Sequence, residues 1–330
     1  MTIRAPQRRI PPPLRVIGAA ALVCVAHAAA QSEYPSRPVR IIVPSAVGGG
    51  NDLIARMIAQ GLTERLGRQT VVENRTGAGT VIGSEIVAKS KPDGYTLLMA
   101  PAALVTIPAT GARVPYDLVR DFAPVTQAAS LPGVVVIHPS VPAKTLTELI
   151  VMARAKPAQL LFSSAGRGTH PHLSMELLAS MAQIKLVHVA YRGTTPGLTD
   201  LLAGQVSMTT ANIVQALPHI RAGRMRALGV TTLKRNAAAP DIPTIAESGL
   251  PGYESVQWYG LLAPAATPAD VIARLHAETV KILGAAEPRT RLAADGADVV
   301  ASAPEEFAAF LKMELSKWQR IAREAGIEPE

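Results

Sequence analysis

Three short stretches of the sequence combine glycine with hydroxyl or amide side chains just before a helical pattern. They are residues 44–52 (PSAVGGGND), 163–173 (SSAGRGTHPHL) and 191–202 (YRGTTPGLTDLL). Glycine lets the backbone approach a ligand closely, and the free amides and positive dipole end of a helix start favour an anion. One such stretch by itself is more often an ordinary turn. Three of them together indicate an oxyanion site formed mainly by backbone groups.

The first stretch favours a carboxylate over a nucleotide. Gly48, Gly49 and Gly50 follow an apolar run and precede a helical pattern. The stretch lacks the Lys-Ser/Thr pair of a Walker A loop and the G-x-G-x-x-G string of a dinucleotide fold. We expect Asn51 or Asp52 to cap the helix that follows.

Hydrolysis is an alternative chemistry that the residue types allow. Ser163, His170 or His172, and Asp200 include the groups of a Ser–His–Asp hydrolase. The sequence has no G-x-S-x-G nucleophile elbow, however. His170 and His172 are two positions apart at a helix start, where side chains do not face each other, so His172 is expected to pack or cap. We expect a protein that is not an enzyme, with an ester hydrolase as the competing class.

Metal or cofactor binding has little support in the sequence. It has no H-E-x-x-H motif and no carboxylate–histidine cluster, so we expect neither a metal nor a cofactor. His188 lies in a strand-like run and His219 is alone in a helical run, and both are expected to be structural. Trp258 and Tyr259 have two interpretations, as core aromatic residues near a hinge or as a cleft wall against an apolar ligand.

The N-terminus is typical of an export signal. Four arginines precede an apolar run at 16–30, which ends in A-x-A patterns at Ala28 and Ala30. Removal of residues 1–30 takes away these four arginines and lowers the formal charge from +8 to +4. Cys24 is the single cysteine, so the exported chain would have no disulfide and no thiolate metal site. We expect a periplasmic protein secreted by this signal peptide.

The bulk composition predicts a globular protein with two domains. The chain has 330 residues, of which 48% are hydrophobic and 18% are charged. Beyond the signal there is no long Lys/Arg run and no basic stripe with interleaved aromatic residues, which argues against a nucleic-acid partner.

Strand and helix patterns alternate after residue 34, which predicts a parallel α/β fold. A strand at 122–129 is expected to leave the first sheet, a second series to begin at 133–139, and a strand at 258–264 to return. The tail is predicted to be helical twice, with a break near Gly296 and a capping signature at 302–306. Two lobes joined by two crossing strands would hold a ligand in the cleft between them. The expected boundaries are 31–125 with 258–330 for the first lobe and 126–257 for the second.

Strings along nearly the whole mature chain resemble one protein family. They include YPSRPVRIIVP, GGGND, PDGYTLL, AGRGTHPHLSMELL, HVAYRGTTPGLTDLLAGQV and PEEFAAFLKMELSKWQRIAREAGI, and they occur in order. The chain resembles the tripartite tricarboxylate transporter substrate-binding proteins, also called Bug-type solute receptors. The resemblance implies a periplasmic two-lobed Venus-flytrap fold of type II that captures a small organic carboxylate.

The resemblance also implies which residues hold the ligand. One carboxyl group would be bound by backbone amides and hydroxyls of the three glycine loops, with further contacts after the strands near residues 100 and 210. The implied ligand-binding residues are Val47, Gly48, Gly49, Gly50, Asn51, Ala102, Ala103, Ser164, Gly168, Thr169, His170, Tyr191, Gly193, Thr194, Thr195, Ala211 and Asn212.

Departures from the family pattern point to a less polar ligand. The family usually has PFPPGG before Thr/Ser-Asp, where this chain has PSAVGGG before Asn-Asp. A polar segment of the kind GTNSTHAINP is APAALVTIP at 100–108, so Ala102, Ala103 and Leu104 replace hydroxyl and imidazole groups. The usual Phe-Asp-Asn is Thr-Ala-Asn at 210–212, without the acid. We expect an aliphatic or aromatic mono- or dicarboxylate with few polar substituents, rather than citrate or an amino acid.

The leading hypothesis is a monomeric solute receptor that works by cleft closure. A ligand that bridges both lobes shifts an open–closed equilibrium, and the closed form is presented to a partner. The resemblance implies a membrane permease as this partner, and a signalling sensor is the alternative. A purely structural exported protein is disfavoured, because the glycine junctions have little structural need for hydroxyls. Arg192 would either reach a second carboxylate across the cleft or lie on the surface, as long cations usually do.

Overall fold

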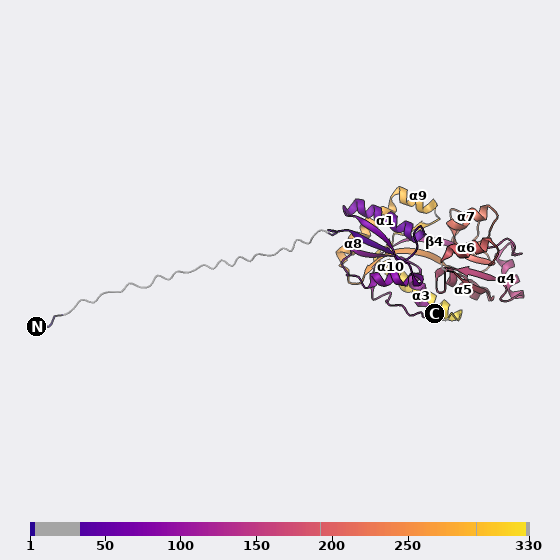
Figure 1. Ribbon diagram of the computed structural model, residues 1–330, viewed down its shortest axis with the longest axis horizontal. Coiled ribbons are helices and arrows are strands. Elements are labelled where there is room, and N and C mark those ends of the chain that lie inside the picture. Colours follow the sequence, from indigo (N-terminus) through magenta and orange to yellow (C-terminus); the bar gives the residue numbers. More distant parts are fainter. Residues whose placement is uncertain (4–33, 192, 295, 328–330) are drawn as a thin grey trace. The chain divides into compact units, whose positions relative to one another are not determined.

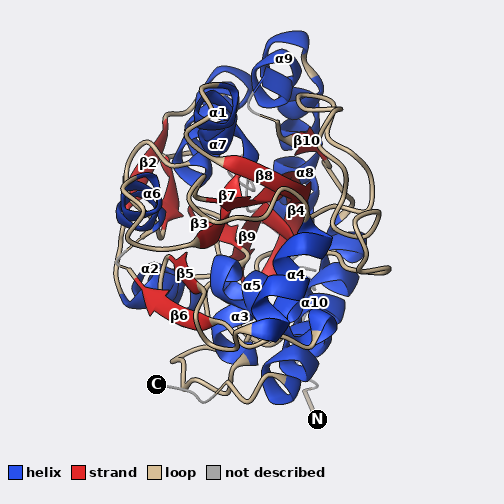
Figure 2. Cartoon of the chain, turned by 90° about the vertical axis from the view of Figure 1, so that its right-hand side faces the viewer, coloured by secondary structure: helices blue, strands red, loops and turns tan. Residues whose placement is uncertain are grey.

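The computed structural model describes residues 1–3, 34–191, 193–294 and 296–327. The predicted signal peptide, from residue 4 onward, and Arg192 lie outside the described residues. Tyr34–Glu330 forms one compact unit. Within this unit strands and helices alternate, with helices packed around the strands (Figure 2).

The first lobe is built on parallel strands. β1 (Val39–Val43) pairs in parallel with β2 (Thr70–Asn74) and with β3 (Thr96–Pro101). The apolar run of β1 is buried except at Arg40, as expected for a strand covered on both faces. The helical elements that follow these strands are α1 (Gly50–Leu66), the 3-10 turn η1 (Ala78–Thr80), α2 (Val81–Ala88) and α3 (Ala103–Ala109).

The second lobe repeats this design. β5 (Leu161–Ser164) pairs in parallel with β6 (Val187–Ala190) and with β7 (Met208–Asn212). β8 (Arg226–Val230) pairs with the long strand β4 (Phe122–Ile137) described next. The helices are α4 (Leu146–Ala155), α5 (His170–Ala182), α6 (Thr194–Leu202) and α7 (Ile213–Arg221).

Two long strands run from one lobe to the other. They are β4 and β9 (Val256–Pro264), and Figure 1 shows β4 between the group of α1 and α8 and the group of α4 to α7. The prediction of separate strands at 122–129 and 133–139 is wrong, because β4 is a single strand. It pairs with β9 as far as Pro132 and with β7 from Gly133 onward. The Pro-Gly pair lies where the pairing partner changes, so proline, which has no N–H to donate, stands at the end of one ladder and the strand continues.

The C-terminal segment folds into more helices than predicted. α8 (Ala269–Gly284), α9 (Ala286–Ala294) and α10 (Pro304–Glu324) replace the two predicted helices, with the first break at Ala285 and the short strand β10 (Asp298–Val299) before α10. The predicted cap Ser302 accepts instead from the Gln127 amide. The Glu306 carboxylate accepts a hydrogen bond from the Ala303 amide at the start of α10, as the Glu of a capping box does.

The aromatic residues of β9 belong to the core. Trp258 is fully buried and packs edge-on against Phe307 and Phe310 of α10, which confirms its core interpretation. Tyr259 is 8% exposed and points to the opposite face of the sheet, where it joins the core under α1. A Cβ added to Gly50 would lie 3.1 Å from the Tyr259 hydroxyl, so this ring lies directly behind the start of α1.

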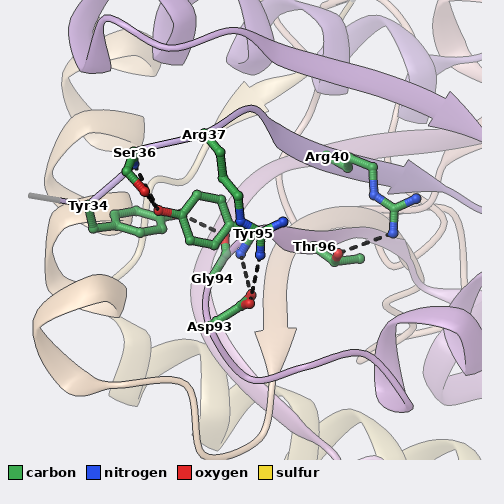
Figure 3. Close-up of polar contacts among 8 residues, drawn as sticks. All are labelled: Tyr34, Ser36, Arg37, Arg40, Asp93, Gly94, Tyr95 and Thr96. Carbon is green, nitrogen blue, oxygen red and sulfur yellow. Dashed lines mark hydrogen bonds and ion pairs between the residues drawn. The ribbon is translucent and has the colours of Figure 1, made fainter. Parts of the chain in front are cut away.

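The beginning of the compact unit is anchored to the turn before β3. Arg37 forms an ion pair with Asp93 at 2.8 Å, and its guanidinium lies 4.0 Å from the centroid of the Tyr95 ring (Figure 3). The Tyr34 hydroxyl donates to the Gly94 carbonyl at 2.6 Å. These contacts hold residues 34–37 beside the turn, so β1 begins next to its partner β3.

Candidate ligand-binding site

The three glycine stretches become helix starts at the carboxyl ends of strands. α1 begins after β1 with Gly49 as its N-cap, α5 after β5 with Thr169, and α6 after β6 with Gly193. No side chain caps any of these three starts, whereas Thr145 accepts the Glu148 amide at the start of α4. The first amides of a helix have no intrahelical acceptor, so these starts keep donors for an anion.

The loop from β1 to α1 is held by a buried carboxylate. Asp52, 1% exposed, accepts hydrogen bonds from the Gly48 amide, Arg56 and Asn74. Burial acts to raise the pKa of Asp52, but these three hydrogen bonds outweigh it and the pKa is lowered. The prediction that Asn51 or Asp52 caps this helix is therefore wrong, because its N-cap is Gly49. Asn51 and Asp52 lie inside the helix, and the Asp52 carboxylate accepts from the amide of Gly48, the residue before the N-cap. The amides of Gly50 and Asn51, in the first turn, have no intrahelical acceptor.

Side chains at this first loop divide between core and solvent. Val47 is 70% exposed, whereas Asn51 is 3% exposed and donates to the Met99 carbonyl at 2.9 Å. Ala102 and Ala103, at the start of α3, are buried and offer no polar side-chain atom.

The two glycine loops of the second lobe are tied together by backbone hydrogen bonds. The Tyr191 amide donates to the Ser164 carbonyl at 3.1 Å, and the Gly193 amide donates to the Ala165 carbonyl at 3.2 Å. The Gly193 amide is therefore already bonded inside the protein. The next donors along this loop are the amides of Thr194 and Thr195, both of which are exposed residues.

His170 is a core residue by its side chain. It is 4% exposed, its Nε2 lies 2.9 Å from the Ser255 hydroxyl, and its ring packs edge-on against Trp318. Burial lowers the pKa of His170 to about 3, so the ring is neutral at neutral pH. Of its groups, the backbone amide at the first position of α5 is the one suited to an anion.

A pocket lies at the carboxyl ends of β5 and β7. Three of its lining residues, Ser164, Thr194 and Ala211, are predicted ligand-binding residues, and Ser163 is the serine of the alternative hydrolase. Every side chain that lines it is uncharged. The other lining residues are Ala165, Pro171, Leu198, Thr209, Thr210 and Gln215.

Sequence reasoning missed Gln215, which lies in the first turn of α7. The available signal was the position of the segment, because β7 followed by α7 is one more strand–helix junction of the same lobe. Asn212, predicted as a ligand residue, ends β7 opposite Gly133 of β4 and is half-buried.

The second-lobe loop also contacts the first lobe. A Cβ added to Gly168 would lie 3.5 Å from Ile107 and from Thr110, which both belong to α3 or its end. The structure thus brings the loop after β5 next to the helix that starts at Ala102 and Ala103. Candidate residues from both lobes therefore lie close together.

The residues of the alternative hydrolase are occupied elsewhere. The Ser163 hydroxyl donates to the Gly197 carbonyl at 3.3 Å. Asp200 accepts from the Tyr191 hydroxyl at 2.6 Å, and this hydrogen bond is the main cause that raises the pKa of Tyr191 to about 12. Within the described residues, no histidine hydrogen bond to Ser163 or Asp200 accompanies these contacts.

The part of the chain that the structure describes lacks two features. In that part no group of His, Cys, Asp and Glu is arranged to hold a metal ion. No helix among the same residues is both long enough and apolar enough to cross a membrane.

Two α/β lobes joined by two crossing strands define a periplasmic solute-binding protein of type II. Residues 54–327 match the family described as "Tripartite tricarboxylate transporter family receptor", TctC. The chain belongs to this family, which confirms the resemblance drawn from the sequence. Receptors of this family are periplasmic solute-binding proteins.

Named relatives cover almost the whole chain. It is 43% identical over 289 residues to the "UPF0065 protein in tcbD-tcbE intergenic region" of Pseudomonas sp. strain P51, which is 87% of this chain and 86% of that protein. It is 35% identical over 299 residues to Protein BugT of Bordetella pertussis, which is 89% of this chain and 90% of that protein.

Solved structures of similar proteins contain carboxylic acids. Rpa4515 of R. palustris, solved with adipate, superposes with a TM-score of 0.83 and 34% identity over 90% of this chain and 100% of that one. MatC of Rhodopseudomonas palustris, solved with malate, gives a TM-score of 0.79 and 32% identity over 88% of this chain and 100% of that one.

Proposed function

We propose that this protein is a periplasmic receptor that captures a small organic carboxylate between its lobes. The observation that carries the proposal is the set of three helix starts without side-chain caps, at the loops after β1, β5 and β6. Their amides and dipoles suit a carboxylate, and they need no cationic side chain to do so. The hydroxyl of Thr194 adds a neutral donor in the pocket of the second lobe.

The ligand is an apolar mono- or dicarboxylate, aliphatic or aromatic. Ala102, Ala103 and Ala211 contribute no polar group at three candidate positions, and the pocket lining carries no charge. A second carboxyl group joined by methylene groups is compatible with such a site, because the hydrocarbon needs no hydrogen-bond partner. The relative that was solved with adipate supports this class of ligand.

Closure around the ligand presents the loaded receptor to a membrane permease. Family membership supports a transporter as the partner. A signalling sensor is the alternative partner, with the same binding chemistry. The receptor acts as a monomer, and residues 1–30 export it to the periplasm as a signal peptide. The lobes comprise residues 31–125 with 258–330 and residues 126–257.

A thermal-shift screen of the mature protein tests this function. We expect adipate, hexanoate and benzoate to raise the melting temperature more than citrate or aspartate, and calorimetry to show one site. Stabilisation by citrate or aspartate but not by the apolar acids would overturn the ligand class. Failure of every acid to bind, together with turnover of an ester by the pure protein, would favour the hydrolase. Native mass spectrometry of freshly purified protein identifies any acid that copurifies.

A further inference from the structure

Three aromatic rings are stacked beside the loop that joins β5 to α5. The His172 and His188 ring centroids are 3.9 Å apart at an interplanar angle of 25°. Phe162 stacks on His188 with a centroid distance of 4.9 Å. The rings belong to β5, α5 and β6, so the stack joins these elements where the loop at 164–169 begins.

His188 forms a hydrogen bond with the Ser164 hydroxyl at the start of this loop. Its Nε2 is 2.6 Å from Oγ of Ser164, and the same oxygen accepts the Gly166 amide at 3.1 Å. Oγ is also 3.0 Å from the Gly166 carbonyl oxygen. A hydroxyl has one proton, so Ser164 donates either to the imidazole or to the Gly166 carbonyl. Burial lowers the pKa of His188 to about 3, so its ring is neutral at neutral pH.

His172 accepts a hydrogen bond from the other end of the loop. The Gly168 amide donates to Nδ1 of His172 at 3.2 Å. In the neutral ring the proton is then on Nε2, which lies 3.5 Å from Oε1 of Glu176. Gly168 has a φ of +70°, a conformation that favours glycine, and a Cβ added to it would lie 3.5 Å from Ile107 of α3.

From this geometry we propose that His172 and His188 are positioning residues of the ligand site. One nitrogen of each ring forms a hydrogen bond with the 164–169 loop, and the two rings together hold the loop in the conformation that binds the ligand. The inference rests on the proposed function, because ligand binding by this loop is part of that function. If the rings only filled space, apolar side chains of similar size could replace them without a loss of ligand affinity. With such side chains, however, the Gly168 amide and the Ser164 hydroxyl would each lose a partner.

Leucine and conservative substitutions separate the two roles. Adipate is the probe, and its affinity for the mature protein is measured by calorimetry. His172→Leu and His188→Leu should each weaken adipate binding about tenfold or more, because a loop hydrogen bond is lost. His172→Asn, whose Oδ1 can replace Nδ1, and His188→Gln, whose terminal amide can replace Nε2, should restore most of the affinity. If the rings had a purely structural role, the Asn and Gln variants would bind adipate no better than the leucine variants of the same melting temperature.

A double-mutant cycle tests the route from His188 through Ser164. Ser164→Ala should weaken binding about as much as His188→Leu, and the double variant should lose little more than either single one. His138→Leu is the matched control, since His138 bonds to Ser140 outside these loops and its loss should leave adipate affinity unchanged. Ser164→Ala removes a single oxygen, so the test remains informative if a leucine variant does not fold.

The outcomes distinguish this inference from the function on which it rests. Absence of adipate binding by the wild type counts against the proposed function. Binding by the wild type with equal affinity in the leucine and alanine variants overturns the positioning role. Additive losses in the double variant would overturn the route through Ser164.

Discussion

Three glycine amides in the candidate site donate hydrogen bonds within the protein and are therefore not available to a ligand. Gly48 donates to Asp52, Gly168 to His172 and Gly193 to the Ala165 carbonyl. Each of these bonds shapes a loop so that the following helix begins without a cap. Glycine is needed at these positions because all three have positive φ. The donors left for an anion are therefore the amides one to three residues further along.

The buried His170 predicts an acid-sensitive stability. Burial lowers its pKa to about 3, whereas an unfolded histidine titrates near 6.5. Between these values the unfolded chain binds the additional proton, so the free energy of unfolding falls as pH decreases from 6.5 toward 3, by up to about 1.4 kcal/mol per pH unit. Urea unfolding at pH 7.5, 6 and 5 measures this fall. The difference between wild type and His170→Gln should shrink with acidification, and a constant difference would contradict the prediction.

Gln215 offers a test of charge in the pocket. Gln215→Glu places a carboxylate in the first turn of α7, where an acid is favourable for the helix, so the fold should be unaffected. The same carboxylate would repel a bound anion, and we expect adipate affinity to fall about tenfold or more in calorimetry. Gln205→Glu, at an exposed residue outside the pocket lining, is the control with the same charge change. Equal affinities in the two variants would show that no anion lies near Gln215.

At the level of elements, the crossing strands depend on close contacts with α10. β9 carries Gly260, and a Cβ added there would overlap the ring of Phe307 in α10. This absence of a side chain lets the helix pack closely on the strand, with Trp258 beside the same ring. The close contact holds the first-lobe end of β9, from which the strand extends toward the second lobe.

Filling this space should destabilise the protein. Gly260→Ala is expected to lower the free energy of unfolding by about 1–3 kcal/mol, because an overpacked core must shift. Chemical denaturation measures the loss. In combination with Phe307→Leu the two losses should be less than additive, since the smaller side chain makes room. Gly284→Ala is the control, because a Cβ there meets nothing within 4 Å and the change should be close to neutral. Strict additivity would contradict the overlap.

For the whole molecule, the two crossing strands connect the lobes, and the proposed closure would take place about them. The partner of β4 changes at Pro132 and Gly133, and the Gly133 amide donates to the Thr231 hydroxyl at 2.9 Å. A ligand shifts the balance toward closure only by as much as it binds the closed form better.

Ligand binding should therefore stabilise and compact the receptor together. At a concentration 100 times its dissociation constant, adipate should add about 2.7 kcal/mol to the free energy of unfolding, which corresponds to roughly 5 °C in melting temperature. Scanning calorimetry measures the stabilisation, and small-angle scattering measures the radius of gyration. A higher melting temperature with an unchanged radius would argue against closure.

Local patterns in the sequence were enough for much of the fold. The alternation of apolar runs with helical periodicity placed most of the strands and helices, because the backbone geometry of each is set over a few neighbouring residues. The glycine stretches predicted helix starts at strand ends, and their positions in the structure agree with that prediction. The strings shared with the receptor family were sufficient to predict the family.

Contacts between distant residues were decided only by the tertiary structure. The continuity of β4 across Pro132 depends on which strands lie beside it, and Gln215 joins the pocket because β7 lies next to β5. His172 and His188 stack on each other because β6 pairs with β5, the strand that α5 follows. Local sequence determines whether a segment forms a helix or a strand, but strand pairing and side-chain packing depend on residues far apart in the chain. For this protein the sequence therefore determined the elements and the kind of site, and the tertiary structure determined which amides remain free and what holds them in place.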